Sequence, residues 1–101
     1  MKWHFLYLLI IAIFLSAGSA SADGGTLFRQ KCGACHKIQG EAAPVNPADK
    51  AGVVWVRYFQ RGRHKIDFSG TINNMELESI ISYLQEFAAD SDKPETAAIP
   101  K

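Results

Sequence analysis

The feature that most constrains this chain is the run Cys32-Gly33-Ala34-Cys35-His36, two thiols three residues apart with an imidazole directly after them. This pattern is typical of covalent attachment of a c-type haem, in which the thiols add to the porphyrin vinyl groups and the histidine becomes the proximal iron ligand. We therefore expect one haem c on Cys32 and Cys35, with His36 on the iron. A thioredoxin-like dithiol, which would need a βαβ context that this sequence lacks, and a structural disulfide are the alternatives.

The first 22 residues have the pattern of a signal peptide. Lys2 supplies a charged start, residues 5–15 form an unbroken apolar run, and Ala-Ser-Ala at residues 20–22 is a small-residue cleavage site. The apolar run is shorter than the roughly 20 residues that span a bilayer. We therefore expect cleavage after Ala22 and a soluble protein exported to the periplasm or another extracytoplasmic compartment. A retained anchor is the alternative, and it would provide the only membrane contact.

The remaining residues are expected to form one small domain. Removing 22 of the 101 residues leaves 79, which is a short chain for burying a stable core. A covalent porphyrin would add apolar surface for helices to pack on, and its iron ligands would join distant segments. The chain without haem is therefore predicted to be largely unfolded.

Charge is unevenly distributed along these residues. The whole chain has 11 Lys and Arg against 10 Asp and Glu, and because Lys2 belongs to the predicted signal peptide, residues 23–101 carry ten of each. The middle of the chain is basic and the last third is acidic. We expect either a solvated surface or electrostatic docking to a redox partner, and no nucleic-acid binding, since the basic residues are few.

Two helices are predicted before residue 62. A short helix leads into the haem motif, with Phe28 one turn before Cys32 and with Gly24 where a second helix could approach closely. The middle helix is predicted over residues 50–61, because Trp55, Val56 and Phe59 share a helical face. The run at residues 53–56 would suit a strand equally well by propensity, but no second strand-like run exists for it to pair with.

The last helix has the clearest signal. Asn73 with Glu76 three residues later resembles a capping box. Apolar residues then recur at three- and four-residue steps through Ala88, which predicts a buried stripe. The members of this stripe are Leu77, Ile80, Ile81, Leu84 and Phe87. Residues 91–101 are polar and aperiodic, and we expect a flexible C-terminal tail there.

A proline-containing loop follows the haem motif. An iron-bound histidine normally donates its second ring N–H to an acceptor that fixes the ring, and a backbone carbonyl in this loop is the natural candidate. The carbonyl of Pro44 is the predicted acceptor for His36. The alternative is that Pro44 and Pro47 only shape the loop.

Taken together, the chain resembles the small monohaem class I c-type cytochromes over roughly residues 24–88. The residues that carry the resemblance are Cys32, Cys35, His36, Gly24, Phe28, Ile80 and Tyr83. The resemblance implies an all-α cytochrome c fold of about three helices and long loops around one haem, within a domain at residues 23–90, and a crossing of the first and last helices. It also supports Pro44, since residues 40–45 are similar to the family's proline loop.

The chain departs from this family at the distal iron ligand. The family usually has a methionine in the loop before the last helix, whereas that loop holds His64 here. Met75, the only methionine after residue 22, falls at the second position of the predicted last helix. Spacing therefore favours His64 as the distal ligand, with Met75 as the alternative and an open or water-bound site as the third.

The resemblance implies single-electron transfer between larger redox proteins outside the cytoplasm, and no enzymatic activity. A site with two histidine ligands would have a low potential. The alternative function is a haem-based ligand-binding, sensor or enzymatic protein with an open or displaceable sixth position. A third is a module of an assembly that docks through its tail or haem edge.

Overall fold

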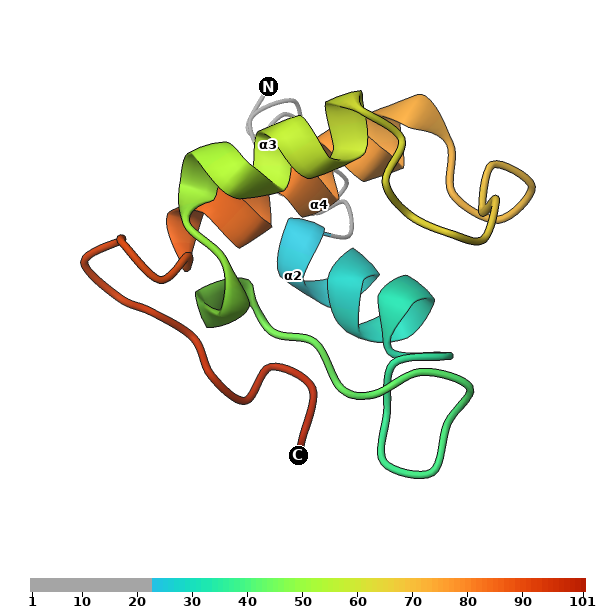
Figure 1. Cartoon of the computed structure of the whole chain (residues 1–101), viewed down its shortest axis with the longest axis horizontal. Helices are drawn as coiled ribbons and strands as arrows, with labels where there is room; N and C mark the ends of the chain where they lie inside the picture. Colours follow the sequence, from blue (N-terminus) through green and yellow to red (C-terminus); the bar gives the residue numbers. More distant parts are fainter. Residues whose placement is uncertain (1–22) are drawn as a thin grey trace, which may run out of the picture.

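The longest helix within residues 23–101, α4 (Asn74–Glu86), is the element on which the other helices pack. The computed structural model describes residues 23–101, and the predicted signal peptide lies outside the described residues. The described part is all-α, as expected, with long loops and no strands (Figure 1). The elements before α4 are α2 (Gly24–Leu27), the π-helical turn η1 (Phe28–Cys32), the 3-10 turn η2 (Pro47–Asp49) and α3 (Gly52–Gln60).

The start of α4 is fixed by the predicted capping box. The Glu76 amide donates to Asn73 Oδ1 at 2.8 Å, and the Asn73 amide donates to Glu76 Oε1 at 3.1 Å. The first turn of a helix leaves its amides without intrahelical partners, and this reciprocal pair satisfies two of them. Ile80 and Leu84 from the predicted apolar stripe are fully buried. The capping box is confirmed, and the stripe is confirmed in part, because its other members, Leu77, Ile81 and Phe87, are half-buried.

Helix α2 crosses α4 at a very short distance. A Cβ atom on Gly24 would collide with the main-chain carbonyl of Ser79, so only glycine permits this approach. Next to it, the rings of Phe28 and Tyr83 pack with centroids 5.7 Å apart. The Asp23 carboxylate caps α2 by accepting from the Thr26 amide at 2.7 Å. The predicted close crossing of the first and last helices is confirmed.

The middle segment is a helix, as predicted, and not a strand. Trp55 is 3 % exposed, and Phe59 stacks on it one turn later with ring centroids 6.3 Å apart. The Trp55 indole N–H donates to the Pro47 carbonyl at 2.8 Å, so its polar atom is satisfied inside the core. Helical spacing brings these two rings onto α4, and the 3.6-residue period therefore prevails over the β propensity of this run.

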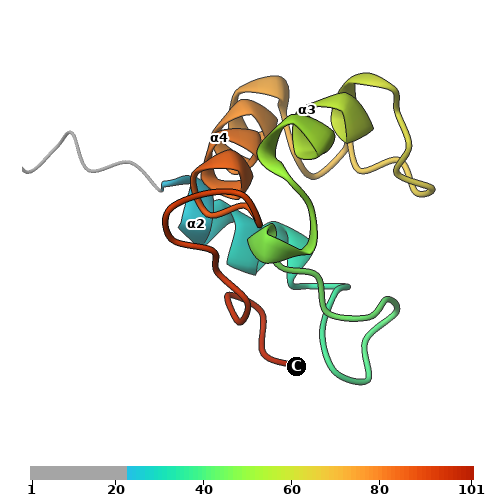
Figure 2. The same ribbon diagram turned by 60° about the vertical axis from the view of Figure 1, so that its left-hand side comes forward.

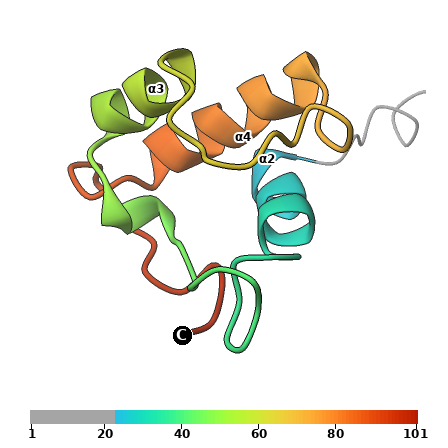
Figure 3. The same cartoon turned by 45° about the vertical axis from the view of Figure 1, so that its right-hand side comes forward.

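The prediction of a flexible tail at residues 91–101 is wrong for this structure. The side chain of Asn46, which is completely buried, donates to the Ile99 carbonyl at 3.0 Å and accepts from the Ile99 amide at 2.8 Å. Ile99 is itself 3 % exposed, and the Ala48 amide donates to the Glu95 carbonyl at 3.0 Å. The tail thus runs beside η2 (Figure 3). A buried amide and a buried isoleucine hold a segment whose composition is otherwise that of a disordered chain.

Two long loops lie on one side of the molecule. One connects η1 to η2 and carries His36, and the other connects α3 to α4 and carries His64. Both lie to the right in Figures 1 and 2. No helix within residues 23–101 is long and apolar enough to cross a membrane.

Candidate functional site

The two loops bring His36 and His64 together. Their ring centroids lie 6.1 Å apart, and the ring planes are inclined at 64°. His36 Nδ1 lies 2.8 Å from the Ala43 carbonyl oxygen, and His64 Nδ1 lies 2.7 Å from the Ile66 carbonyl oxygen. Because a carbonyl oxygen only accepts, each Nδ1 carries the proton and donates. In a neutral imidazole this leaves Nε2 unprotonated, which is the form that ligates a metal.

The spacing of the two rings fits a single metal ion between them. Metal–imidazole bonds of about 2.0 Å on opposite sides of one ion place the ring centroids about 6 Å apart. The observed 6.1 Å agrees with that value. This distance would allow His36 and His64 to bind one iron together.

The His36 loop is folded by its own main chain. The Ala42 amide donates to the Cys35 carbonyl at 3.0 Å, and the Lys37 amide donates to the Ala42 carbonyl at 3.3 Å. Gln39 has a φ of 61°, a left-handed conformation that reverses the chain between these two bonds. These main-chain bonds place the Ala43 carbonyl beside the His36 imidazole. The prediction that Pro44 is the acceptor is therefore wrong by one residue.

The His64 loop begins at a glycine-terminated helix end. Gly62 has a φ of 59°, and no atom would obstruct a Cβ there, so its backbone conformation is what requires glycine. The Arg63 amide donates to the Tyr58 carbonyl at 3.1 Å and the Gly62 amide to the Phe59 carbonyl at 3.2 Å, which together form a Schellman motif. This motif ends α3 at Gln60, four residues before His64, and turns the chain away from the helix axis.

An aromatic side chain supports the His64 ring. Phe68 packs against His64 in an edge-on arrangement with centroids 4.9 Å apart, and against Phe59 of α3 with centroids 6.3 Å apart. The imidazole is therefore held on one side by an aromatic ring that is itself attached to the core, and at Nδ1 by the Ile66 carbonyl.

One side chain bridges the haem motif and the His64 loop. The Lys31 ammonium donates to the Thr71 carbonyl at 2.9 Å and lies 3.9 Å from the Glu76 carboxylate. Lys31 immediately precedes Cys32, and Thr71 lies at the end of the loop that carries His64. This contact joins the segments that carry the two histidines.

The cysteines occupy a turn directly after η1. Cys32 packs against the core and Cys35 is exposed, and both thiols are free. Burial, with a smaller contribution from the neighbouring Cys35, raises the pKa of the Cys32 thiol to about 11. The attacking thiol of a thioredoxin-like motif has a lowered pKa, so this environment does not suit Cys32 for that role. The His36 amide donates to the Cys32 carbonyl at 2.9 Å, which ties the imidazole to the same turn.

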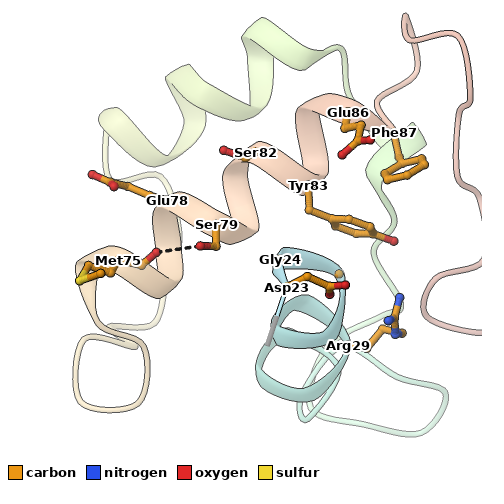
Figure 4. A pocket seen from close by; sticks show the side chains of 11 residues that line it. Asp23, Gly24, Arg29, Met75, Glu78, Ser79, Ser82, Tyr83, Glu86 and Phe87 are labelled. Atoms are coloured by element: carbon orange, nitrogen blue, oxygen red, sulfur yellow. Dashed lines mark hydrogen bonds between the residues drawn. The ribbon is translucent and has the colours of Figure 1, made fainter. Parts of the chain in front are cut away.

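Met75, the alternative distal ligand, lies away from the two histidines. Its side chain is 79 % exposed in the first turn of α4, where it lines an open groove between α2 and α4 (Figure 4). The other lining residues include Asp23, Ser79 and Tyr83, and neither histidine is among them. The structure thus brings His64 to His36 and leaves Met75 among residues of the helix crossing.

Three residues of the site were not identified from the sequence. Ala43 and Ile66 contribute main-chain carbonyls, which every residue has, so residue type carries no signal for them. Phe68 had a weak signal, as an aromatic residue four positions after His64. Within residues 23–101 no group of three or more His, Cys, Asp or Glu side chains could hold a metal ion. Two imidazoles alone would leave the coordination of an iron incomplete, so further donors would be needed from another source.

No protein-family model, no curated protein and no solved structure matches this chain.

Proposed function

We propose that this protein is an exported single-electron carrier with one haem c, covalently attached at Cys32 and Cys35 and ligated by His36 and His64. The observation that carries the proposal is the pair of neighbouring imidazoles, whose ring centroids lie 6.1 Å apart and whose Nδ1 atoms are each fixed by a main-chain carbonyl. The bound iron would supply the redox chemistry by alternating between the ferric and ferrous states.

The protein contributes a fixed pair of ligands. Each imidazole is oriented by a short hydrogen bond from Nδ1, and His64 also packs against Phe68. Ligands that are held in place change little between oxidation states, and a carrier needs this because rearrangement slows electron exchange. A filled sixth position also disfavours the alternative of a gas sensor or an enzyme.

Two exposed apolar side chains beside the histidines support a bound porphyrin. Ile38 is 57 % exposed in the His36 loop, and Ile66 is 64 % exposed in the His64 loop. Large aliphatic side chains on two neighbouring loops are unfavourable in water. A porphyrin between the two histidines would provide apolar surface close to both loops.

Intact mass and absorption spectra of the exported protein test the proposal. We expect the mass of residues 23–101 plus one haem, no free thiol, and the spectrum of a low-spin iron with two histidine ligands. A disulfide between Cys32 and Cys35 with no porphyrin would overturn the proposal.

The sixth ligand is tested by a matched pair of variants. His64→Ala should bind added imidazole in the ferric state and carbon monoxide in the ferrous state, because the variant vacates one axial position. Met75→Ala should leave the spectrum unchanged, since Met75 is exposed and lies outside the site. If the wild type shows the weak long-wavelength band of thioether ligation and Met75→Ala removes it, then Met75 is the ligand and His64 is not.

A further inference from the structure

We propose that the outward face of α3 and the start of the His64 loop form a docking surface for a redox protein with an acidic contact face. This basic surface comprises Val53, Val54, Arg57, Arg61, Arg63 and Lys65. The inference rests on the proposed electron-transfer function and assigns the class of partner and the side of the molecule at which it binds.

The geometry of α3 separates the basic surface from the core. Trp55 and Phe59 face inward onto the core, whereas Val53 and Val54 are 52 % and 43 % exposed. Arg57 and Arg61 follow Val53 at steps of four residues, so valines and arginines share the outward face. In Figure 1 this helix is on the outside of the fold and leads directly into the His64 loop.

The basic side chains of this surface form no ion pair within residues 23–101. No Asp or Glu occurs from Lys50 to Ile66. Arg57, Arg61, Arg63 and Lys65 are all exposed, and within residues 23–101 the one ion pair is Lys31 with Glu76. Residues 23–101 carry ten basic and ten acidic side chains, so the positive potential here reflects local segregation of charge and not an overall excess.

The composition favours a protein partner. Protein interfaces combine an apolar centre with a charged rim and are enriched in arginine, whose planar guanidinium binds carboxylates through two hydrogen bonds. The valine pair with its flanking arginines has this composition. An anionic lipid surface offers a similar charge, but lipid exchanges no electron with iron. The surface continues into His64, so a partner bound there would lie close to a proposed iron ligand.

The experiment measures reduction of the ferric, haem-loaded protein by an acidic plant-type [2Fe–2S] ferredoxin in a stopped-flow instrument. The second-order rate constant should fall about tenfold or more between low and high salt, because screening removes electrostatic steering. Arg57→Gln combined with Arg61→Gln should lower it about three- to tenfold at low salt and flatten the salt dependence. The control is Lys93→Gln with Lys101→Gln, which changes the net charge equally at two exposed sites outside the basic surface.

Equal rate constants for the two double variants would overturn the docking proposal while leaving the haem assignment intact. A second outcome would also overturn the docking proposal. In it, the wild type binds phosphatidylglycerol vesicles and the arginine variant does not, while the two proteins react with ferredoxin at the same rate. That result would assign the surface to a membrane. An exported protein without haem in its mass spectrum would instead overturn the proposed function itself. The unaltered spectrum of each variant verifies that its fold is intact.

Discussion

The Lys31 ammonium binds the Thr71 carbonyl at 2.9 Å and thereby connects the residue before the haem motif to the far end of the His64 loop, 40 positions later. The Glu76 carboxylate lies 3.9 Å from the same ammonium. The two segments that carry His36 and His64 are thus joined by one charged hydrogen bond.

Lys31→Met should therefore loosen the distal ligand. The variant keeps the apolar stem and removes the donor, at a cost of about 1 kcal/mol because the contact is partly solvated. Carbon monoxide should bind the ferrous variant several-fold faster than the wild type, since His64 would leave the iron more often. Lys31→Arg should restore the slow rate. Lys37→Met, at an exposed site without this contact, is the control, and an equal acceleration in it would refute the role of Lys31.

The reduction potential should rise in His64→Met. Imidazole donates well to ferric iron, whereas a thioether favours the ferrous state, so the shift should be upward, within the span of about 0.8 V that axial ligands cover. Spectroelectrochemical titration measures it. An unchanged potential, in a variant whose spectrum shows thioether ligation, would contradict the assignment of His64.

Phe28→Ala should destabilise the protein strongly. Phe28 is 1 % exposed and packs on Tyr83 at the crossing of α2 and α4, so truncation leaves a cavity at the close contact of the two helices. We expect a loss of about 3 to 5 kcal/mol in the free energy of unfolding, measured with denaturant. Val53→Ala, at a 52 % exposed position on α3, should change it by less than about 0.5 kcal/mol. An unchanged midpoint for Phe28→Ala would place that ring outside the core.

Loss of haem should unfold most of the chain. The apolar core is small, and the two loops that carry the histidines are long and poor in regular structure. Cys32→Ala combined with Cys35→Ala prevents covalent attachment, and its circular dichroism should show little helix. Native helix content in this variant would show that the polypeptide folds without the porphyrin.

Removal of residues 97–101 should lower the free energy of unfolding by about 3 kcal/mol. The deletion exposes the core that Ile99 covers and leaves the buried Asn46 amide without its two partners. Deleting only residues 100 and 101 retains Ile99 and should have little effect on the unfolding midpoint. Equal midpoints for the two deletions would mean that the tail contributes no stability.

The helices could be predicted because their signals are local. Asn73 and Glu76 form the capping box that their spacing indicates, and Gly24 permits the close crossing because it has no Cβ. His64 also lies near His36, at 6.1 Å between ring centroids, while its role as an iron ligand stays a prediction that rests on the few strong ligands after position 22. In each of these cases the prediction rests on the chemistry of one side chain: a capping oxygen, a missing Cβ or an imidazole.

The remaining features depend on backbone register and on distant contacts. The acceptor for His36 is Ala43 and not Pro44, because main-chain bonds between Cys35 and Ala42 set where the loop closes. The packed tail was missed because its anchor is an asparagine, a residue type that is usually exposed, paired with the backbone of Ile99. The π-helical turn at residues 28–32 likewise has no compositional signal.

The bond between Asn46 and Ile99 has a consequence for the order of events during synthesis. Its two residues are 53 positions apart, so a chain growing from its N-terminus contains the complete Cys32–His36 motif long before Asn46 has a partner. The loop between them includes α3, His64 and α4, all of which must be made before this contact can form. We expect the chain to reach its final fold only after Ile99 has been synthesised. Until then the thiols of Cys32 and Cys35 belong to an incompletely folded chain and are accessible to modification.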